Sequence, residues 1–360
     1  MTSMNCEDVR YFSVKEPLDY DQRFPFFREP KEQGCLSLGN DREFYNDARE
    51  LKYLCMPKSE IHFNLNVGYN DMIIQYHTDE KLDNLLRWIL VNKHKFSINT
   101  ESVESLNTDF VCYRGLLTVI LCTPYEQRED WLICATKFKG TIYLCAFPTQ
   151  QYLQRKENET ERDRIMTAWG HKFETYMVTN RENGSPDAKS PVNTNKEYCV
   201  IVRSRLKNHS LVYGAEVDCV EQCSYEGSKP YVELKTSRNI TSDRQHRNFC
   251  RFKLLKWWVQ SFLIGIPKII CGFRDDDGFV GHLETFVVQD IPKLSQNCWS
   301  ASSCFNFCNE FLAFVKDCVT EDNPCVVYEF YRPPGKNIIC KKLPLGYHQI
   351  LPDWYINHWN

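Results

Sequence analysis

The sequence lacks several features that define specialised protein classes. No C-x-x-C spacing occurs among its 18 cysteines, so zinc knuckles and thioredoxin-like redox sites have no support. There is no excess of basic residues: 44 Lys+Arg against 47 Asp+Glu give a formal net charge of −3, which excludes a bulk polycation but not a local basic groove. No internal repeat or low-complexity tract is present. With 42% apolar side chains over 360 residues, we expect a globular chain with a large core.

Long apolar runs are also missing. The most apolar stretch, at about 259–273, contains Gln260, Pro267 and Lys268 and is too short to cross a bilayer. The first residues lack the apolar region and small-residue cleavage site of a signal peptide. We therefore expect neither membrane association nor secretion. Most cysteines lie inside apolar runs, where they predict buried free thiols rather than disulfides or metal ligands.

The pattern of apolar residues predicts an α+β fold with mixed, largely antiparallel sheets flanked by helices, because strands and helices do not alternate regularly. A polar segment at 180–196, rich in Asn, Pro, Ser and Gly, predicts an exposed loop within one large domain that spans 1–360. The predicted strands are 110–123, 131–138, 141–147, 198–205, 211–220, 231–236, 267–273 and 325–331. The predicted helices are 150–168, 244–264 and 303–318.

Acidic residues alternate with apolar ones in GAEVDCV (214–220) and YVELKTS (231–237). Side chains alternate between the two faces of a strand. In the first strand Glu216 and Asp218 therefore lie on one face, and in the second strand Glu233 and Lys235 lie on one face. If 221–230 connects the two strands as a hairpin, three carboxylates and one ammonium group meet on one surface. The alternative is a solvated sheet face, on which acid and lysine residues often alternate.

Clustered carboxylates repel one another, and a divalent cation removes that repulsion. Oxygen ligands select Mg²⁺ or Mn²⁺, and two such ions activate a water and stabilise the leaving oxygen of a phosphoryl displacement. Lys235 would orient the attacking water and offset charge in the transition state. This Asp…Glu-x-Lys arrangement resembles that of the PD-(D/E)xK nuclease superfamily.

Further residues have suitable chemistry, each with an ordinary alternative. Arg114 lies in an apolar run and is either a phosphate clamp or part of an internal salt bridge. Glu174 is either a fourth carboxylate of the site or an ordinary helix-face residue. Gln260, four residues after Lys256, would bind a water, a ribose or a phosphate oxygen, or is a surface amide. A basic strip suits a nucleic-acid backbone or a solvated helix face and consists of Arg244, Arg247, Arg251 and Lys253.

Five motifs in chain order resemble the DXO family of eukaryotic decapping exoribonucleases. They are YRG at 113–115, G-x-K-F-E at 170–174, GAEVD at 214–218, ELK at 233–235 and KWWVQSFLIGIPKIICGFRD at 256–275. A weaker match, LSLGNDREFYNDARELKYL, extends the resemblance to the N-terminal part of the chain. The resemblance implies removal of incomplete (unmethylated) caps, NAD caps (deNADding) or pyrophosphate from 5′-triphosphate RNA, with 5′→3′ degradation of 5′-monophosphate RNA.

The resemblance also implies roles for individual residues. Two Mg²⁺ or Mn²⁺ ions would be held by Glu174, Glu216, Asp218, Glu233 and the backbone carbonyl of Leu234. The scissile phosphate and the water would be contacted by Arg114 with its neighbours Tyr113 and Gly115, and by Lys235 and Gln260. Lys235, Gln260, Glu233 and Asp218 would be catalytic. The positions that correspond to contacts with the 5′ nucleotides are Arg42, Glu80 and Cys199.

Three further expectations complete this interpretation. The family suggests nuclear residence, with the cytoplasm as the alternative, and a 5′→3′ exoribonuclease as a protein partner. A different PD-(D/E)xK nuclease that acts on DNA is the first alternative function. A non-catalytic, RNA-binding activator or scaffold of an exonuclease is the second.

Overall fold

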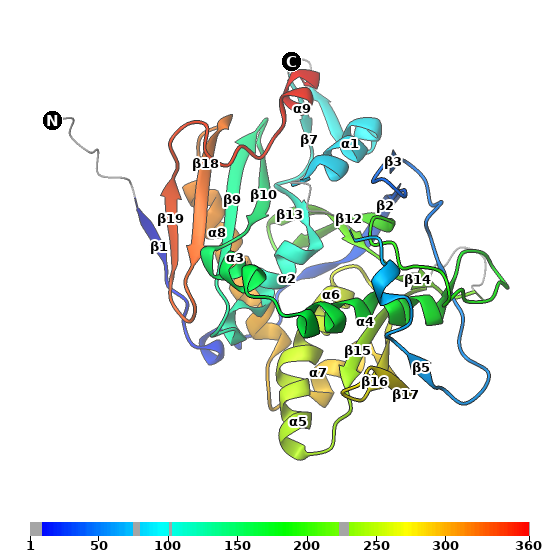
Figure 1. Cartoon of the computed structure of the whole chain (residues 1–360). Helices are drawn as coiled ribbons and strands as arrows, with labels where there is room; N and C mark the ends of the chain where they lie inside the picture. Colours follow the sequence, from blue (N-terminus) through cyan, green and yellow to red (C-terminus); the bar gives the residue numbers. More distant parts are fainter. Residues whose placement is uncertain (1–8, 75–79, 101–102, 223–229, 360) are drawn as a thin grey trace.

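Two large β-sheets form the framework of the chain (Figure 1). The computed structural model describes residues 9–74, 80–100, 103–222 and 230–359. Both sheets contain parallel and antiparallel pairs, and helices pack against them, so the predicted fold class is confirmed. A separate two-stranded sheet pairs β6 (Ser97–Thr100) with β7 (Val103–Leu106).

The larger sheet has ten strands. Their order across the sheet is β1 (Arg10–Phe12), β19 (Ile338–Lys342), β18 (Asn323–Arg332), β9 (Trp131–Phe138), β10 (Thr141–Phe147), β8 (Phe110–Tyr113), β13 (His209–Glu216), β12 (Glu197–Leu206), β2 (Phe27–Leu38) and β3 (Phe44–Tyr45). Strands β9 and β10 form a hairpin, in which Lys139 and Gly140 turn with φ of 48° and 79°. Gly140 adopts this left-handed conformation at little steric cost.

The smaller sheet has seven strands. Their order is β11 (Val178–Thr179), β4 (Tyr53–Leu54), β14 (Cys219–Val220), β15 (Tyr231–Arg238), β16 (Lys268–Arg274), β17 (Phe279–Val287) and β5 (Phe63–Asn64). The β15–β16 pair is parallel, with Glu233 opposite Ile269. This sheet lies at the lower right of Figure 1, behind the long helix α4.

The α-helices of the described chain are α1 (Asp83–Val91), α2 (Arg114–Cys122), α3 (Gln150–Glu157), α4 (Glu161–Met177), α5 (Asp243–Asn248), α6 (Leu255–Phe262), α7 (Ile291–Leu294), α8 (Ala301–Cys318) and α9 (Asp353–His358). A π-helical turn, η5 (Phe249–Leu254), joins α5 to α6, so the predicted helix at 244–264 is present. Leu117, Trp258 and Phe305 from α2, α6 and α8 share one core cluster with residues of both sheets. This common core fixes the two sheets relative to each other.

Two predicted strands are wrong in part. The run 110–123 is a short strand followed by helix α2, because Leu116, Leu117, Ile120 and Leu121 are all buried at helical spacing. A helix buried on several sides and a buried strand have the same apolar composition, so periodicity does not separate them. The run 211–220 is also divided, since β13 ends at Glu216 in one sheet and β14 begins at Cys219 in the other.

Other predictions concern loops and cysteines. Residues 180–196 form no helix or strand, and most of those at 180–191 are exposed. Most of the expected connection at 221–230 lies outside the described residues. The cysteines that the structure describes are free thiols. Within the same residues, no helix has the length and apolar character that a membrane span requires. A single domain over 1–360 stays a prediction.

Candidate active site

The acidic residues meet where the two sheets join. Glu216 is the last residue of β13, and Asp218 directly precedes β14. Cys219 pairs with Val232, so β14 lies antiparallel to β15, which carries Glu233 and Lys235. One Asp218 carboxylate oxygen accepts a hydrogen bond from the Leu234 backbone N–H at 2.6 Å. The predicted strand pairing therefore forms at Asp218, whereas Glu216 reaches the site from the neighbouring sheet.

Helix α4 brings a fourth carboxylate. Its N-terminus is fixed by a capping box between Thr160 and Asp163, and the helix packs on β15. Glu174, in the last turn, lies within electrostatic range of Asp218 and Glu216. Burial, followed by these two negative charges, raises the pKa of Glu174 well above its usual value. The helix thus completes the predicted set of four acids.

The pKa values of the two junction residues are raised as well. Removal from bulk water and the charges of Glu197 and Asp218 raise the pKa of Glu216 to about 8, although its side chain remains open to the adjoining cavity. Burial and the charge of Glu233 raise the pKa of Asp218 to about 6. Carboxylates with such pKa values are partly protonated near neutrality and ionise when a cation approaches.

Glu233 and Lys235 form a tight ion pair, with Nζ 2.5 Å from Oε1. Burial alone would raise the pKa of Glu233, but the charges of Lys235 and Arg114 outweigh it and hold the pKa below its usual value. Burial opposes the charge of Lys235, but Glu233 and Asp218 more than compensate and raise its pKa. The second oxygen of Glu233, Oε2, is buried and has no hydrogen-bond partner among the described residues. An acceptor of this kind suits a cation or a substrate hydrogen.

Arg114 begins helix α2 and connects the parts of the site. Its Nη1 donates to the backbone oxygen of Gln260 on α6 at 3.1 Å, and Nη2 donates to the backbone oxygen of Glu216 at 3.4 Å. The guanidinium also lies 3.9 Å from Glu233 Oε2. Tyr113 immediately precedes α2. The space beside the Cα of Gly115 is open, since a Cβ added there would meet no atom within 4 Å. The internal salt bridge that was the alternative for Arg114 is present, and Arg114 still lies beside the acids.

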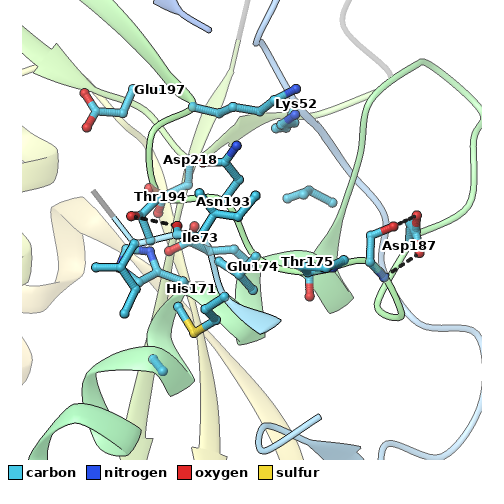
Figure 2. Close-up of a pocket in the computed structure, with 18 of the residues that line it drawn as sticks. Lys52, Ile73, His171, Glu174, Thr175, Asp187, Asn193, Thr194, Glu197 and Asp218 are labelled. Carbon is cyan, nitrogen blue, oxygen red and sulfur yellow. Dashed lines mark hydrogen bonds between the residues drawn. The ribbon is translucent and has the colours of Figure 1, made fainter. Parts of the chain in front are cut away.

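A cavity of about 1200 Å³ opens beside these residues (Figure 2). Of the predicted site residues, Glu174, Glu216 and Asp218 line it. The loop at 180–196 supplies part of its wall, including Asn193 and Thr194. Ile73 is paired to this loop through backbone hydrogen bonds to Val192 and Thr194. The polar loop therefore borders the same space as the carboxylates.

The residues predicted to contact 5′ nucleotides lie beside Glu197 and Glu216, which line the cavity. Arg42 donates to Glu80 through Nε and Nη2 at 2.9 and 2.6 Å, and its Nη1 lies 2.7 Å from Glu197. Its guanidinium is thus already engaged with protein carboxylates. Cys199 is buried in β12 directly opposite Glu216 of β13. Their contact with substrate stays a prediction.

Other cavity residues were missed in the sequence. His171 lies one turn before Glu174 on α4, and burial followed by the charge of Lys235 lowers its pKa. Glu197 directly precedes the predicted strand at 198–205, two positions before Cys199, and this spacing could have indicated a shared face. Lys52 and Lys196 also line the cavity. No local pattern marks either lysine, because they become neighbours through the fold.

The donor set suits a hard divalent cation because it consists of carboxylates with raised pKa and a buried, unbonded carboxylate oxygen. In the part of the chain that the structure describes, no three acidic, histidine or cysteine side chains converge closely enough to enclose an ion.

Comparisons with known proteins agree with this geometry. Residues 28–356 match the family model described as RAI1 like PD-(D/E)XK nuclease. The decapping and exoribonuclease protein of Xenopus laevis is 40% identical, and that of Homo sapiens 38%; each match covers 95% of this chain and 88% of the relative. These relatives confirm the predicted enzyme class, a hydrolase that acts on phosphodiester bonds.

Solved structures give the same fold. S. pombe Rai1 in complex with 3′-FADP is 26% identical, with a TM-score of 0.75 over 93% of this chain and 100% of that one. Candida albicans Rai1 in complex with pU5-Mn²⁺ is 21% identical and resembles this chain in fold, with a TM-score of 0.83 over 97% and 98%. The resemblance seen in the sequence motifs is thereby confirmed: this chain belongs to the RAI1-like PD-(D/E)XK nuclease family.

Proposed function

We propose that this chain hydrolyses phosphate bonds at the 5′ ends of RNA in a reaction that depends on divalent cations. Its substrates would be unmethylated caps, NAD caps and 5′-triphosphates, and it would also degrade 5′-monophosphate RNA in the 5′→3′ direction. The observation that carries the proposal is the group of Glu174, Glu216 and Asp218 on one cavity, beside the Lys235–Glu233 ion pair. The named activities of its relatives support the choice of RNA ends.

Two Mg²⁺ or Mn²⁺ ions would be held by Glu174, Glu216, Asp218, Glu233 and the carbonyl oxygen of Leu234. When bound, such ions activate a water and stabilise the leaving oxygen. Lys235 would orient the water and offset negative charge on the phosphoryl group, since its ammonium stays protonated beside Glu233. Arg114 and the side chain of Gln260 would position the scissile phosphate from α2 and α6. Nuclear residence and an exoribonuclease partner stay predictions.

The test is a substrate panel with one matched inactive variant. Unmethylated-capped, NAD-capped, 5′-triphosphate and 5′-monophosphate RNAs, and single-stranded DNA, are incubated with Mg²⁺ or Mn²⁺. Wild type should release 5′ products from RNA, and Asp218→Ala/Glu233→Ala should not. Equal inertness of both proteins on every RNA would indicate a non-catalytic activator. Cleavage of DNA without cleavage of RNA would indicate the DNA nuclease.

A further inference from the structure

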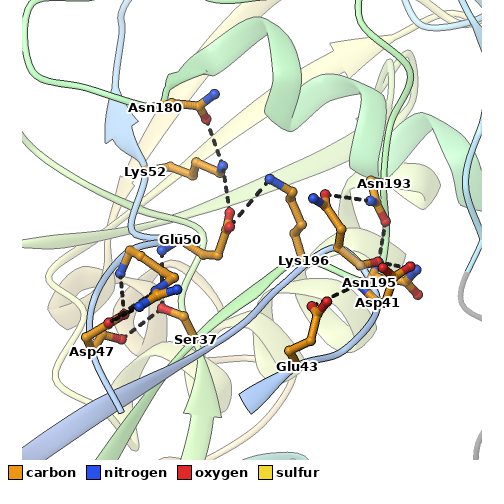
Figure 3. Close-up of polar contacts among 12 residues, drawn as sticks. Ser37, Asp41, Glu43, Asp47, Glu50, Lys52, Asn180, Asn193, Asn195 and Lys196 are labelled. Atoms are coloured by element: carbon orange, nitrogen blue, oxygen red, sulfur yellow. Dashed lines mark hydrogen bonds and ion pairs between the residues drawn. The ribbon is translucent and has the colours of Figure 1, made fainter. Parts of the chain in front are cut away.

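A pair of lysines on the cavity wall is linked through the carboxylate of Glu50 (Figure 3). Lys52 Nζ and Lys196 Nζ each lie 3.4 Å from a different oxygen of Glu50. Both lysines line the cavity, whereas the Glu50 side chain is only 13% exposed behind them. Two ammonium groups therefore share one carboxylate, which leaves one excess positive charge facing the cavity.

Both lysines are held by rigid parts of the fold. Lys52 directly precedes β4, and its backbone oxygen accepts a hydrogen bond from Val220 N–H of β14 at 3.0 Å. Its Nζ donates to Asn180, the first residue of the 180–196 loop, at 2.7 Å. Lys196 ends that loop and directly precedes β12. The pair is thus placed at the start of one strand of each sheet, on the same cavity as Asp218.

The ammonium groups retain hydrogen-bonding capacity. An ammonium has three donors, and a charged hydrogen bond to a carboxylate is normally 2.7–2.9 Å long. The 3.4 Å separations from Glu50 are longer than this. For Lys196 Nζ, no hydrogen bond is found within the described residues. A structural ion pair alone would need one lysine, whereas a second, weakly engaged lysine suits an anionic ligand.

We propose that Lys52 and Lys196 bind a phosphodiester group of the RNA backbone, on the 3′ side of the bond that is hydrolysed. The inference rests on the proposed function, which supplies RNA as the ligand. The scissile phosphate would lie beside Lys235, whereas the lysine pair lines the cavity, so the pair would meet a later phosphate of the same strand. Backbone contacts of this kind position a strand without reading its bases. The 180–196 loop thereby acquires a role, because Asn180 and Lys196 are its two ends.

Binding of a fluorescent, 5′-phosphorylated pentanucleotide in Ca²⁺ tests the site, with intact oligonucleotide verified on a gel. We expect Lys52→Gln and Lys196→Gln each to weaken binding about fivefold. Each should also lower the slope of log affinity against log salt by about 0.7, the contribution of one phosphate contact in a single strand. Lys189→Gln, an exposed lysine of the same loop that does not line the cavity, is the matched control and should bind like wild type.

Glu50→Gln separates a ligand site from a structural cluster. It removes the shared carboxylate and raises the local charge, so RNA binding should stay equal or become tighter. Weakening as large as that of the lysine variants would show that the cluster only supports the fold, and would overturn the proposal. Unchanged affinity and salt slope in both lysine variants would overturn it as well.

Chemically altered oligonucleotides identify the phosphate. With a 5′-hydroxyl pentanucleotide, Lys196→Gln should still lower the binding affinity. If Lys196→Gln lowered the affinity only for 5′-phosphorylated RNA, the lysine pair would bind the terminal phosphate, and the proposal would be contradicted. Replacing one internal phosphodiester by a neutral methylphosphonate should weaken RNA binding by wild type. With this oligonucleotide, Lys196→Gln should cause no additional loss of affinity. Hydrolysis of the same RNA by wild type with Mn²⁺ tests the proposed function separately. If wild type hydrolysed the RNA but both lysine variants bound it as wild type does, only the lysine site would be rejected.

Discussion

At the residue scale, Lys235 and Glu233 fix each other's charge. The 2.5 Å ion pair keeps the ammonium beside the acids without using the second Glu233 oxygen. Lysine is not a ligand of a hard cation, so its role lies in the reaction rather than in ion binding. The two functions should therefore separate in a variant that removes the ammonium but keeps the aliphatic stem.

Lys235→Met should lower the single-turnover rate of RNA hydrolysis about 10²- to 10³-fold, as loss of one preorganised charge does. Mn²⁺ affinity measured by calorimetry should stay within about tenfold of wild type, because no ligand is lost. Lys342→Met is the control, since Lys342 is an exposed lysine paired with Glu321 and carries no proposed catalytic or RNA-binding role. Abolished Mn²⁺ uptake in Lys235→Met would reject this division of roles.

The raised pKa values of Glu216 and Asp218, about 8 and about 6, predict proton-coupled ion binding. Below these values the carboxyl groups hold protons that a cation must displace, and above them they are already ionised. Mn²⁺ affinity should therefore rise between pH 6 and 8, by up to about tenfold per pH unit for each proton released, and level off above pH 8. Glu216→Gln should flatten the upper half of this profile. An equally steep profile in that variant, or constant affinity across the range in wild type, would contradict the assignment.

At the scale of elements, Arg114 joins three parts of the chain. Its guanidinium donates to the backbone oxygen of Glu216 at the end of β13 and to that of Gln260 in α6. It also lies 3.9 Å from the carboxylate of Glu233 in β15. Because these contacts hold three elements together beside the acids, Arg114 would have both a structural role and a phosphate-binding role. Changes at Arg114 should therefore affect both stability and activity.

Arg114→Gln should lower the free energy of unfolding by about 2–3 kcal/mol, somewhat less than rupture of a close buried ion pair. It should also raise the pKa of Glu233 and reduce RNA hydrolysis. Arg114→Lys keeps the charge but not the planar group of donors, so it should recover part of the stability and little of the activity. Urea unfolding and turnover on 5′-monophosphate RNA measure the two effects. Full activity in Arg114→Lys would show that only charge matters at this position.

Buried Lys172 anchors the 180–196 loop. Its Nζ donates to the Ala188 oxygen at 2.6 Å, and the side chain is 2% exposed. Lys172→Met should release the loop, so that trypsin cleaves within it about tenfold faster, as expected for loss of one charged hydrogen bond. Lys156→Met, which removes an exposed lysine, is the control. If Lys172→Met left the cleavage rate unchanged, other contacts would be sufficient to hold the loop.

Sequence reasoning reached the acids because short motifs carry them, but it could not place the elements exactly. Glu233 and Lys235 follow from strand alternation within β15. Arg114 was assigned to a strand because a buried helix has no polar face to reveal its period. The ion pairs of Arg42 with Glu80 and Glu197, and of Lys196 with Glu50, join residues distant in sequence. Such contacts depend on tertiary packing and leave no local pattern.

At the scale of the whole molecule, the cavity is lined by charges of both signs. Glu174, Glu216 and Asp218 line it together with Lys52 and Lys196, while the chain as a whole carries a formal charge of only −3. This arrangement allows a cation and a polyanion to be bound side by side, because each has its own group of opposite charge. The core that the two sheets share fixes the acids and the lysine pair relative to each other.

Ion binding should stabilise the folded molecule as a whole. At about 100 times its Kd, a ligand that binds only the native state adds about 2.7 kcal/mol. Mn²⁺ should therefore raise the Tm of wild type by a few degrees, and EDTA should reverse the shift. Asp218→Asn/Glu233→Gln should show no such shift, because two ligands are weakened. An equal rise in Tm in both proteins would place the bound ion elsewhere.

The most direct measurement is the release of 5′ products from one 5′-monophosphate RNA during titration of EDTA-treated protein with Mn²⁺. We predict that wild type is inactive without the ion and gains activity in a saturable manner, whereas Asp218→Asn/Glu233→Gln stays inactive at every concentration. Hydrolysis by metal-free wild type, or equal activation of the variant, would contradict the assignment of these carboxylates as the catalytic centre.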